Sequence, residues 1–389
     1  MRQTRMARLL CTVLCASSSL LFGCATVRGQ GGGSRNFDRS VPLEDAAATS
    51  ANVSIGDVNA DGHQDIVLVK GRHWPLDNLV LLGVGNGSFH PAYPLGNRPD
   101  RSYSGVLVDM DGDGALDVVV SNDTPDPKIV HLNDGRGRFV PGATFGRGEW
   151  STRHISVIDL NGDALPDVVL ANRYGRNPGP SYVCFGAQGG KFAEACVGFA
   201  PGSATTIKAA DFSGDGFPDL AVPHRDGGQS FIYLNDGKGG FGERRPFGPT
   251  TAAIRSAEAA DLDGNGVVDL VVIDERTGPA IFWGRADGTY SAAEALGKGG
   301  ATPYALAVAD LDRNGRSDVL VGYVKSRPIV YFNDGPNTFH AVPFGDTEGT
   351  AYGFAVGDLD EDGFLDIALA RSEARNMLYF GAPANAGLR

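Results

Sequence analysis

An aspartate-rich nonapeptide recurs seven times in this chain of 389 residues, with first residues Asp57, Asp109, Asp159, Asp211, Asp261, Asp310 and Asp358. Positions 1, 3, 5 and 9 of every copy carry an oxygen-bearing side chain, and position 7 can add a backbone carbonyl. Several oxygen atoms of this kind, most of them carboxylate, suit Ca²⁺, whereas Mg²⁺ demands a stricter octahedron and softer metals prefer nitrogen or sulfur. The sequence therefore predicts up to seven calcium sites. Their expected side-chain ligands are Asp57, Asn59, Asp61, Asp65, Asp109, Asp111, Asp113, Asp117, Asp159, Asn161, Asp163, Asp167, Asp211, Ser213, Asp215, Asp219, Asp261, Asp263, Asn265, Asp269, Asp310, Asp312, Asn314, Asp318, Asp358, Asp360, Asp362 and Asp366.

Four of the copies differ from the others at positions that affect metal affinity. Ala164 replaces the turn glycine at position 6 of the third copy, and Ser213 is a weaker ligand at position 3 of the fourth. Asn265 and Asn314 replace aspartate at position 5 of the fifth and sixth copies. We therefore expect copies three to six to bind Ca²⁺ less tightly than copies two and seven, which hold four aspartates each.

The nonapeptide must be distinguished from an EF-hand loop, which needs Glu at position 12 and a helix on each side. Position 12 is apolar in all seven copies: Leu68, Val120, Leu170, Val222, Val272, Val321 and Leu369. Short β-rich runs such as DIVLV and DVVV follow the loops, and runs such as SGVLV precede them. Each loop is therefore expected to join two adjacent strands, and the EF-hand interpretation fails.

The spacing of the copies predicts the fold. Successive first residues are separated by 48 to 52 residues, and seven such units account for almost all of the chain from Phe37 onward. Short β-rich runs broken by Gly, Pro, Asn and Asp indicate an all-β chain. No apolar run approaches the roughly 18 residues that span a bilayer. A repeat of this length with several strands predicts a seven-bladed β-propeller of four-stranded blades over residues 37–389.

The two ends of the chain are expected to meet in one blade. Outer strands recur as a Phe and a Pro five residues later, as in Phe89 to Pro94 and Phe241 to Pro246. The seventh unit stops before such a strand, whereas the segment from Phe37 to Pro42 matches it. We predict that this N-terminal strand completes the last blade and closes the ring, which ties down both termini.

The seven loops, together with the hairpin segments LNDGRGRF, LNDGKGGF and FNDGPNTF, resemble the FG-GAP/VCBS repeat family. Relatives in that family include the head of integrin alpha chains, certain fungal lectins and many exported bacterial proteins. The resemblance extends from Phe37 to about Pro383. It implies an integrin-like propeller with calcium-binding loops, in which each ion holds one loop in place.

The N-terminal residues have the pattern of an export signal. Arg2, Arg5 and Arg8 precede a short apolar stretch, which indicates a signal peptide over residues 1–23. The segment LLFGC resembles the lipobox of bacterial lipoproteins, with Cys24 as the lipidated residue, although the bulky Phe22 leaves ordinary cleavage open. Residues 24–36 form a Gly-rich tether. We expect an exported outer-membrane lipoprotein, periplasmic or surface-facing, that meets the membrane through a lipid anchor only.

Two cysteines remain in the predicted propeller. Cys184 and Cys196 flank the turn AQGGK, and a hairpin centred on Gly190 places them directly opposite each other. An exported chain favours a disulfide between them. The alternative is a pair of buried thiols, and in either case the pair is structural.

The charge balance also favours metal binding. The formal net charge is −12, and it becomes −15 when Arg2, Arg5 and Arg8 are removed with the signal peptide. Half of the 46 acidic residues lie in the seven loops, so seven divalent ions would nearly neutralise the chain. This composition argues against a nucleic-acid partner.

Candidate ligand-binding residues lie at the opposite end of each inner strand from the metal loop. The residues six positions before the loops are Ala51, Tyr103, Arg153, Thr205, Arg255, Tyr304 and Tyr352. These positions should converge around a central channel, and His154 is adjacent. Arginine and aromatic side chains around a concavity suit an anionic or carbohydrate ligand. The candidate ligand face is Tyr103, Arg153, His154, Arg255, Tyr304 and Tyr352. A second, wider ring is predicted from Lys70, Asn122, Asn172, His224, Asp274, Tyr323 and Arg371.

Three classes of function are compatible with these features. The first is a monomeric binding or adhesion module that recognises a glycan or a protein through this face. The second is a lyase-like enzyme acting on polysaccharides, with a Tyr or His base beside an arginine. The third is a structural partner in an envelope assembly. The sequence contains no nucleophile elbow or phosphate loop, so no catalytic residue is assigned and a non-enzymatic role is favoured.

Overall fold

The computed structural model describes residues 35–174, 179–297 and 299–384. The expected signal peptide, Cys24 and the tether up to residue 34 lie outside these residues. All regular elements of the described part are β-strands, as predicted. Within it, no helix could span a membrane. We number the repeats 1 to 7 after their aspartate loops.

Repeats 2 to 6 each form a separate four-stranded antiparallel sheet. Repeat 2 contains β7 (Ser102–Val108), β8 (Asp117–Asn122), β9 (Lys128–Asn133) and β10 (Phe139–Phe145). Repeat 3 contains β11 (Thr152–Ile158), β12 (Asp167–Asn172), β13 (Gly179–Cys184) and β16 (Val197–Gly202), with the small hairpin β14 (Gly186–Ala187) and β15 (Lys191–Phe192). Repeat 4 contains β17 (Lys208–Ala210), β18 (Asp219–Val222), β19 (Ser230–Leu234) and β20 (Glu243–Phe247). Repeat 5 contains β21 (Ile254–Ala260), β22 (Asp269–Asp274), β23 (Gly278–Phe282) and β24 (Glu294–Ala295). Repeat 6 contains β25 (Pro303–Ala309), β26 (Asp318–Tyr323), β27 (Ile329–Gly335) and β28 (Thr338–Pro343).

Repeats 1 and 7 differ from this pattern because they share one eight-stranded sheet. Repeat 1 contributes β3 (Ala48–Gly56), β4 (Asp65–Lys70), β5 (Leu79–Leu81) and β6 (Tyr93–Pro94). Repeat 7 contributes β29 (Thr350–Gly357), β30 (Asp366–Ala374) and β31 (Met377–Tyr379). The two groups, which were expected to be separate, join because β3 and β30 are nine residues long and their ends pair with each other.

The N-terminal strand β2 (Ser40–Pro42) pairs with β31 in antiparallel register, with Val41 opposite Leu378. Phe37 is buried, and its ring centroid lies 5.4 Å from that of Phe344. Residues 35 and 36 were expected to be the end of a flexible tether, and this expectation is wrong. They form strand β1 (Arg35–Asn36), which pairs with β32 (Ala382–Pro383) near the other end of the described chain.

Apolar side chains bury themselves between neighbouring sheets. Among the described residues, seven apolar clusters each combine two consecutive repeats, and one of them joins repeat 7 to repeat 1 through residues such as Ala368 and Ile66. The second strands, such as β4 and β8, are buried along their whole length. Both faces of these strands are covered, which explains why their sequences are continuous apolar runs.

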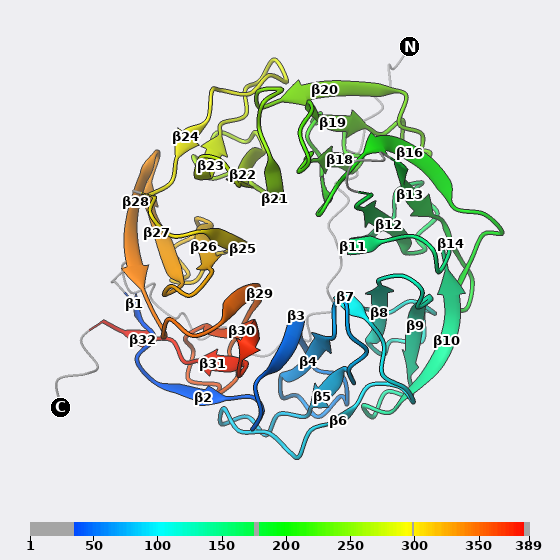
Figure 1. Cartoon of the computed structure of the whole chain (residues 1–389), viewed down its shortest axis with the longest axis vertical. Coiled ribbons are helices and arrows are strands. Elements are labelled where there is room, and N and C mark those ends of the chain that lie inside the picture. Colours follow the sequence, from blue (N-terminus) through cyan, green and yellow to red (C-terminus); the bar gives the residue numbers. More distant parts are fainter. Residues whose placement is uncertain (1–34, 175–178, 298, 385–389) are drawn as a thin grey trace, which may run out of the picture. The chain divides into compact units, whose positions relative to one another are not determined.

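The first strands of the repeats contact one another in sequence, and β29 contacts β3. These strands therefore lie around a common centre within the described residues (Figure 1). Each first strand begins at one end of this centre and leads into its aspartate loop at the other. The predicted disulfide between Cys184 and Cys196 is present and joins β13 to the residue before β16, with the two Cα atoms 4.2 Å apart.

Candidate functional site

The seven aspartate loops have nearly identical backbone-to-carboxylate hydrogen bonds. The amide of position 6 donates to an oxygen of the position 1 aspartate at 2.8–3.0 Å in every loop. The amide of position 7 donates to the side-chain oxygen of position 5 at 2.7–2.9 Å, whether that residue is Asp or Asn. Position 6 has a positive φ in all seven loops, and Ala164 adopts it as well, at 64°. The loop conformation therefore persists without the turn glycine, at a steric cost.

The aspartate at position 9 ties the loop to its sheet. All seven of these side chains are buried and begin the second strand of their repeat: Asp65, Asp117, Asp167, Asp219, Asp269, Asp318 and Asp366. One carboxylate oxygen accepts a hydrogen bond from a backbone amide of the loop. The other accepts one from a backbone amide at or just beyond the end of the third strand, and these bonds are 2.7–2.9 Å long. Burial raises the pKa of Asp269 to about 6 and that of Asp318 to about 7, and the other loop carboxylates add to the shift.

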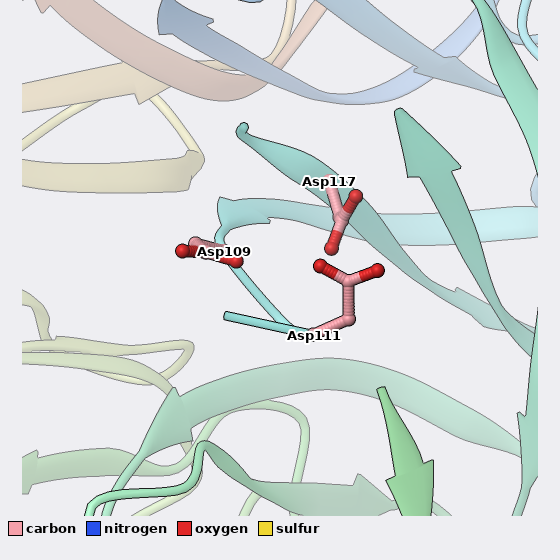
Figure 2. A group of neighbouring side chains, drawn as sticks. All are labelled: Asp109, Asp111 and Asp117. Atoms are coloured by element: carbon pink, nitrogen blue, oxygen red, sulfur yellow. The ribbon is translucent and has the colours of Figure 1, made fainter. Parts of the chain in front are cut away.

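In four loops, the aspartates of positions 1, 3 and 9 place one oxygen each within 4.8 Å of one another. Figure 2 shows one such group, in which the carboxylate of Asp111 points toward that of Asp117. The four groups are Asp109, Asp111 and Asp117; Asp261, Asp263 and Asp269; Asp310, Asp312 and Asp318; and Asp358, Asp360 and Asp366. These are the four loops with aspartate at position 3, since loops 1, 3 and 4 have Asn59, Asn161 and Ser213 there.

This grouping differs from the order of affinities expected from the sequence. Loops 5 and 6 were placed with the weaker sites because of Asn265 and Asn314, yet both bring three carboxylates together. The reason is that the three carboxylates come from positions 1, 3 and 9, whereas the residue at position 5 accepts a hydrogen bond from the amide of position 7, and Asn accepts it as well as Asp. Whether a loop brings three carboxylates together therefore depends on the residue at position 3 and not on the residue at position 5.

The residues of these loops fit a hard divalent cation. The side-chain donors are oxygen atoms, as such cations prefer. In loop 7, Asp358 Oδ1 is buried and has no hydrogen-bond partner in the described structure. This loop also meets the N-terminal strand, because Arg39 forms an ion pair with Asp360. Loop 7 therefore has both an unsatisfied carboxylate oxygen and a competing cationic side chain.

The residue at or just after the end of the third strand alternates between Gly and Asn from one repeat to the next. In repeats 2, 4 and 6 the residue is Asn133, Asn235 or Asn333, and its side-chain amide donates to a carbonyl in the loop of the preceding repeat at 2.7–2.8 Å. In repeats 1, 3, 5 and 7 the residue is Gly83, Gly186, Gly284 or Gly381, where a Cβ atom would collide with the carbonyl oxygen of loop position 8. The asparagines thus link the loops of repeats 1 and 2, 3 and 4, and 5 and 6.

At the opposite end of the first strands, a β-bulge changes the direction of the side chains. The register shifts once in β3, β7, β11, β21, β25 and β29, and each time the extra residue is the one six positions before the loop. Bulges of this kind re-aim side chains. As a result, consecutive residues such as Arg153 and His154, or Tyr103 and Ser104, line the same cavity.

That cavity has a volume of about 300 Å³ and lies at the centre of the first strands. It is lined by all seven residues of the predicted ring: Ala51, Tyr103, Arg153, Thr205, Arg255, Tyr304 and Tyr352. The structure therefore brings the proposed ligand-face residues together, and His154 lies among them. We call the rim formed by these seven residues and Arg72 the mouth.

Arginines stack on each tyrosine of the mouth. Arg153 lies 4.2 Å from the ring centroid of Tyr103, and Arg255 lies 3.3 Å from that of Tyr304. Arg72 lies over Tyr352 at 4.0 Å and within 5.7 Å of Tyr103. Arg72, from the repeat whose mouth residue is Ala51, therefore connects the tyrosines of repeats 7 and 2. With it, contacts between arginine and tyrosine side chains extend from repeat 5 through repeats 6, 7, 1 and 2 to repeat 3.

Carboxylates hold these arginines in place. Asp123 pairs with Arg153 at 2.9 Å, while Glu275 pairs with both Arg225 at 2.6 Å and Arg255 at 3.3 Å. Burial raises the pKa of Tyr304, but Arg255, the hydrogen bond with Tyr352 and the charges of Arg72 and Arg225 together outweigh burial, so that the pKa is lowered. The mouth is thus locally positive although the chain as a whole is acidic.

Other predicted residues have different surroundings from those expected. Six of the seven residues of the wider ring are buried, namely Lys70, Asn122, Asn172, Asp274, Tyr323 and Arg371. They lie at the ends of second strands, which are covered on both faces, so these six side chains are not exposed for contact with a ligand. His154 lies deep in the cavity, where burial lowers its pKa to about 3, so that it is neutral.

Six overlapping segments match the model of the FG-GAP-like repeat: residues 57–120, 109–170, 159–222, 211–272, 261–321 and 310–369. Each segment runs from the first residue of one aspartate loop to position 12 of the next. Together they cover more than half of the chain. The chain belongs to the FG-GAP-like repeat family.

The fold of this FG-GAP-like repeat protein is similar to that of solved structures with little sequence identity. One is BBS1N in complex with ARL6DN, from a mercury-soaked crystal, with a TM-score of 0.60 and 11% identity over 91% of this chain and 98% of that chain. A lead-soaked crystal of the same complex gives a TM-score of 0.59, 11% identity and coverage of 90% and 98%. No curated protein matches the sequence.

Two functional features of the FG-GAP-like repeats were not anticipated from the sequence. The first is Arg72, whose place in the mouth depends on the path of the segment after β4. The second is a chain of hydrogen bonds from the Tyr103 hydroxyl to His73 Nε2 at 2.9 Å, and from His73 Nδ1 to Asp123 at 3.0 Å. No local pattern marks Arg72 or His73, because neither lies in the repeated motif.

Proposed function

We propose that this FG-GAP-like repeat protein is a seven-bladed, calcium-binding β-propeller that acts as a binding module for a glycan or a protein through its mouth. The seven repeats are the blades, and β2 completes the last one, beside β31. Repeats 1 and 7 remain two blades in this description, since their shared sheet arises only from the paired ends of β3 and β30. Calcium in the loops holds the strands in place and does not contact the ligand.

The observation that carries this proposal is the convergence of the seven mouth residues on one cavity. In six repeats a β-bulge turns the residue toward the centre, and these residues include two arginines and three tyrosines. A concavity with fixed aromatic and charged groups is typical of a ligand site. The BBS1N structures similar in fold contain a protein partner, which supports keeping a protein ligand alongside a glycan.

The binding function is tested by screening glycan and protein arrays with the full mature chain, with and without a chelator. Tyr304→Ala should abolish capture of the ligand, because it removes the ring beneath Arg255. Phe217→Ala is the matched control, since this exposed aromatic residue lies in loop 4 at the other end of the first strands. Equal capture by wild type and Tyr304→Ala would contradict a ligand site at the mouth.

We further propose that the protein is exported and anchored through Cys24, as a monomer on the outer membrane. The support is the basic, apolar and lipobox pattern of residues 1–24. Labelled palmitate should be incorporated by the wild type and not by Cys24→Ser. Release of unlabelled wild-type protein into the soluble fraction would show ordinary cleavage instead.

One observation favours a second function, that of a polysaccharide lyase. The hydrogen-bond chain from Tyr103 through His73 to Asp123 can move a proton, and Arg153 lies beside the tyrosine. In such a β-elimination Tyr103, having passed its hydroxyl proton to His73, would take the proton from the carbon that bears the uronate carboxylate. The electrons of that C–H bond form a C=C double bond as the neighbouring C–O bond to the next sugar breaks, and the leaving oxygen takes the proton back from the tyrosine. The product is an unsaturated uronate that absorbs ultraviolet light. Its formation by wild type but not by Tyr103→Phe would establish the enzyme, and its absence across uronate polymers would leave the binding module.

A further inference from the structure

The stack of arginines and tyrosines around the mouth is interrupted at repeat 4. The residue at the ring position there is Thr205, and the adjacent lining residue is Thr206. The first strand of this repeat, β17, has only three residues, whereas every other first strand has at least seven. It begins three residues after Thr205, on the loop side of the mouth, and its pairing with β18 carries no bulge. Thr205 is therefore the smaller side chain between Arg153 of repeat 3 and Arg255 of repeat 5, and we call this interruption of the stack the gap.

The charges around this gap do not balance. Arg255 and Arg225 share a single carboxylate, Glu275, so one of the two guanidinium groups has no acidic group of its own. Lys208, which lines the cavity below Thr206, is paired with Glu258 at 2.8 Å. A guanidinium has five N–H donors. Within the described structure Arg153 donates one hydrogen bond and Arg255 donates two. The gap thus has an excess of positive charge and donors to spare.

Two polar atoms at the gap also have no partner. Thr205 Oγ1 and His154 Nδ1 are buried and form no hydrogen bond within the described structure. Buried polar groups are normally paired. Both residues line the cavity, so a ligand group entering it lies beside them. The hydroxyl of Thr205 can donate to an anion, and so can a His154 tautomer that is protonated on Nδ1.

We propose that the gap at Thr205 is a carboxylate subsite, flanked by Arg153 and Arg255, that recognises the acid group of a uronate-type sugar. The inference rests on the proposed binding function and specifies its ligand class. A cavity of about 300 Å³ lies at the lower limit of small-molecule sites, so it fits one sugar ring and its substituents but not a folded peptide segment. Hydroxyl groups of Thr205, Thr206 and Tyr304 around the arginines suit the several hydroxyls of a sugar.

Isothermal titration of the full mature chain with trigalacturonate tests this assignment. Neutral trigalactose and a short glutamate-rich peptide serve as comparison ligands. Thr205→Tyr closes the gap without removing a charge, and Arg255→Gln removes one flanking guanidinium. Arg136→Gln is the matched control, since this exposed arginine lies in the turn after β9, beside the aspartate loops. A melting curve of each variant checks that it is folded.

The subsite predicts that trigalacturonate binds and trigalactose does not. Both Thr205→Tyr and Arg255→Gln should weaken binding at least tenfold, whereas Arg136→Gln should leave it unchanged. Equal binding of the neutral sugar, or unchanged affinity in folded Thr205→Tyr, would overturn the assignment. Tighter binding of the acidic peptide than of trigalacturonate would assign the gap to a protein ligand instead.

These results separate the subsite from the wider proposal. If a ligand found on the arrays is lost in Tyr304→Ala but shows no dependence on Arg255 or Thr205, the mouth is a binding site and the carboxylate subsite is wrong. If every captured ligand is insensitive to Tyr304→Ala, the mouth itself is not the binding site.

Discussion

The two ends of the first strands differ in how faithfully they repeat. At the loop end, the same three kinds of carboxylate hydrogen bond recur in all seven repeats. At the mouth end, the equivalent residue is Ala, Tyr, Arg or Thr, and in repeat 4 the first strand does not extend to that end. Seven identical loops can all stabilise the fold in the same way, whereas recognition of one ligand requires different side chains around it. We therefore infer that the loops maintain the fold and that the mouth carries specificity.

Metal removal tests this division with the largest expected effect. If the loops bind Ca²⁺ in the folded state only, each site filled at a hundredfold excess over its dissociation constant adds about 2.7 kcal/mol to the free energy of unfolding. Chelation should therefore lower the melting temperature strongly, as measured by circular dichroism. Chelator saturated with Ca²⁺ is the control. An unchanged melting curve would show that the loops are held by their hydrogen bonds alone.

The sequence was sufficient to predict the loop positions and the seven ring residues of the mouth, but not the bulges that aim those residues or the position of Arg72. Loop positions, strand order, the Cys184–Cys196 bridge and the N-terminal strand follow from period and local pairing. The β-bulge could not be predicted, because it depends on the register between two strands. The position of Arg72 depends on residues from repeats 2 and 7, and Asn235 contacts a carbonyl 75 residues away. Single-sequence patterns do not report contacts of this kind.

The asparagines at the ends of third strands provide the next largest effect. Asn235 is buried, and its side chain donates to the carbonyls of Leu160 and Pro218 at 2.8 and 3.0 Å. Asn235→Ala leaves both carbonyls without this donor and should lower the free energy of unfolding by about 2–4 kcal/mol. Urea denaturation measures the change. Asn97→Ala, at an exposed bend, should change the free energy of unfolding by less than about 0.5 kcal/mol, and similar values for both variants would contradict a link between repeats.

Adding a carboxylate to loop 3 tests whether position 3 sets metal affinity. Asn161 is the position 3 residue of loop 3, which has aspartate at positions 1 and 9 as the four three-carboxylate groups do. Asn161→Asp should raise the affinity of this site for Ca²⁺ about tenfold, equivalent to about 1.4 kcal/mol. Calcium titration calorimetry would detect one additional tight site. Asn86→Asp controls for the added charge, and an equal gain from it would indicate a general electrostatic effect.

At the mouth, removal of one hydroxyl group should weaken ligand binding while leaving the protein folded. The hydroxyls of Tyr352 and Tyr304 are hydrogen-bonded at 2.8 Å, and Arg72 covers the ring of Tyr352. Tyr352→Phe keeps the ring and removes the bond, so stability should fall by no more than about 1 kcal/mol. Ligand affinity should fall about fivefold, which also corresponds to about 1 kcal/mol. A loss of stability with unchanged affinity would place Tyr352 with the structural residues.

The smallest effect is expected where one loop departs from the others. Ala164 occupies the left-handed conformation that glycine adopts in the other six loops, and its amide makes the same bond to Asp159 at 2.8 Å. Ala164→Gly relieves about 1–2 kcal/mol of steric strain but increases the entropy of the unfolded chain by about 0.5–1 kcal/mol. The two contributions leave a net stabilisation of about 0.5 kcal/mol, measurable by urea denaturation in the presence of Ca²⁺. The reverse change in loop 4, Gly216→Ala, should lower the free energy of unfolding by a similar amount. Gly216 has a φ of 90°, like the glycines of the other loops, and alanine is strained at such a positive φ. If the two variants change the free energy of unfolding in opposite directions, the seven loops share one conformation in solution. If both change it in the same direction, loop 3 has a conformation of its own.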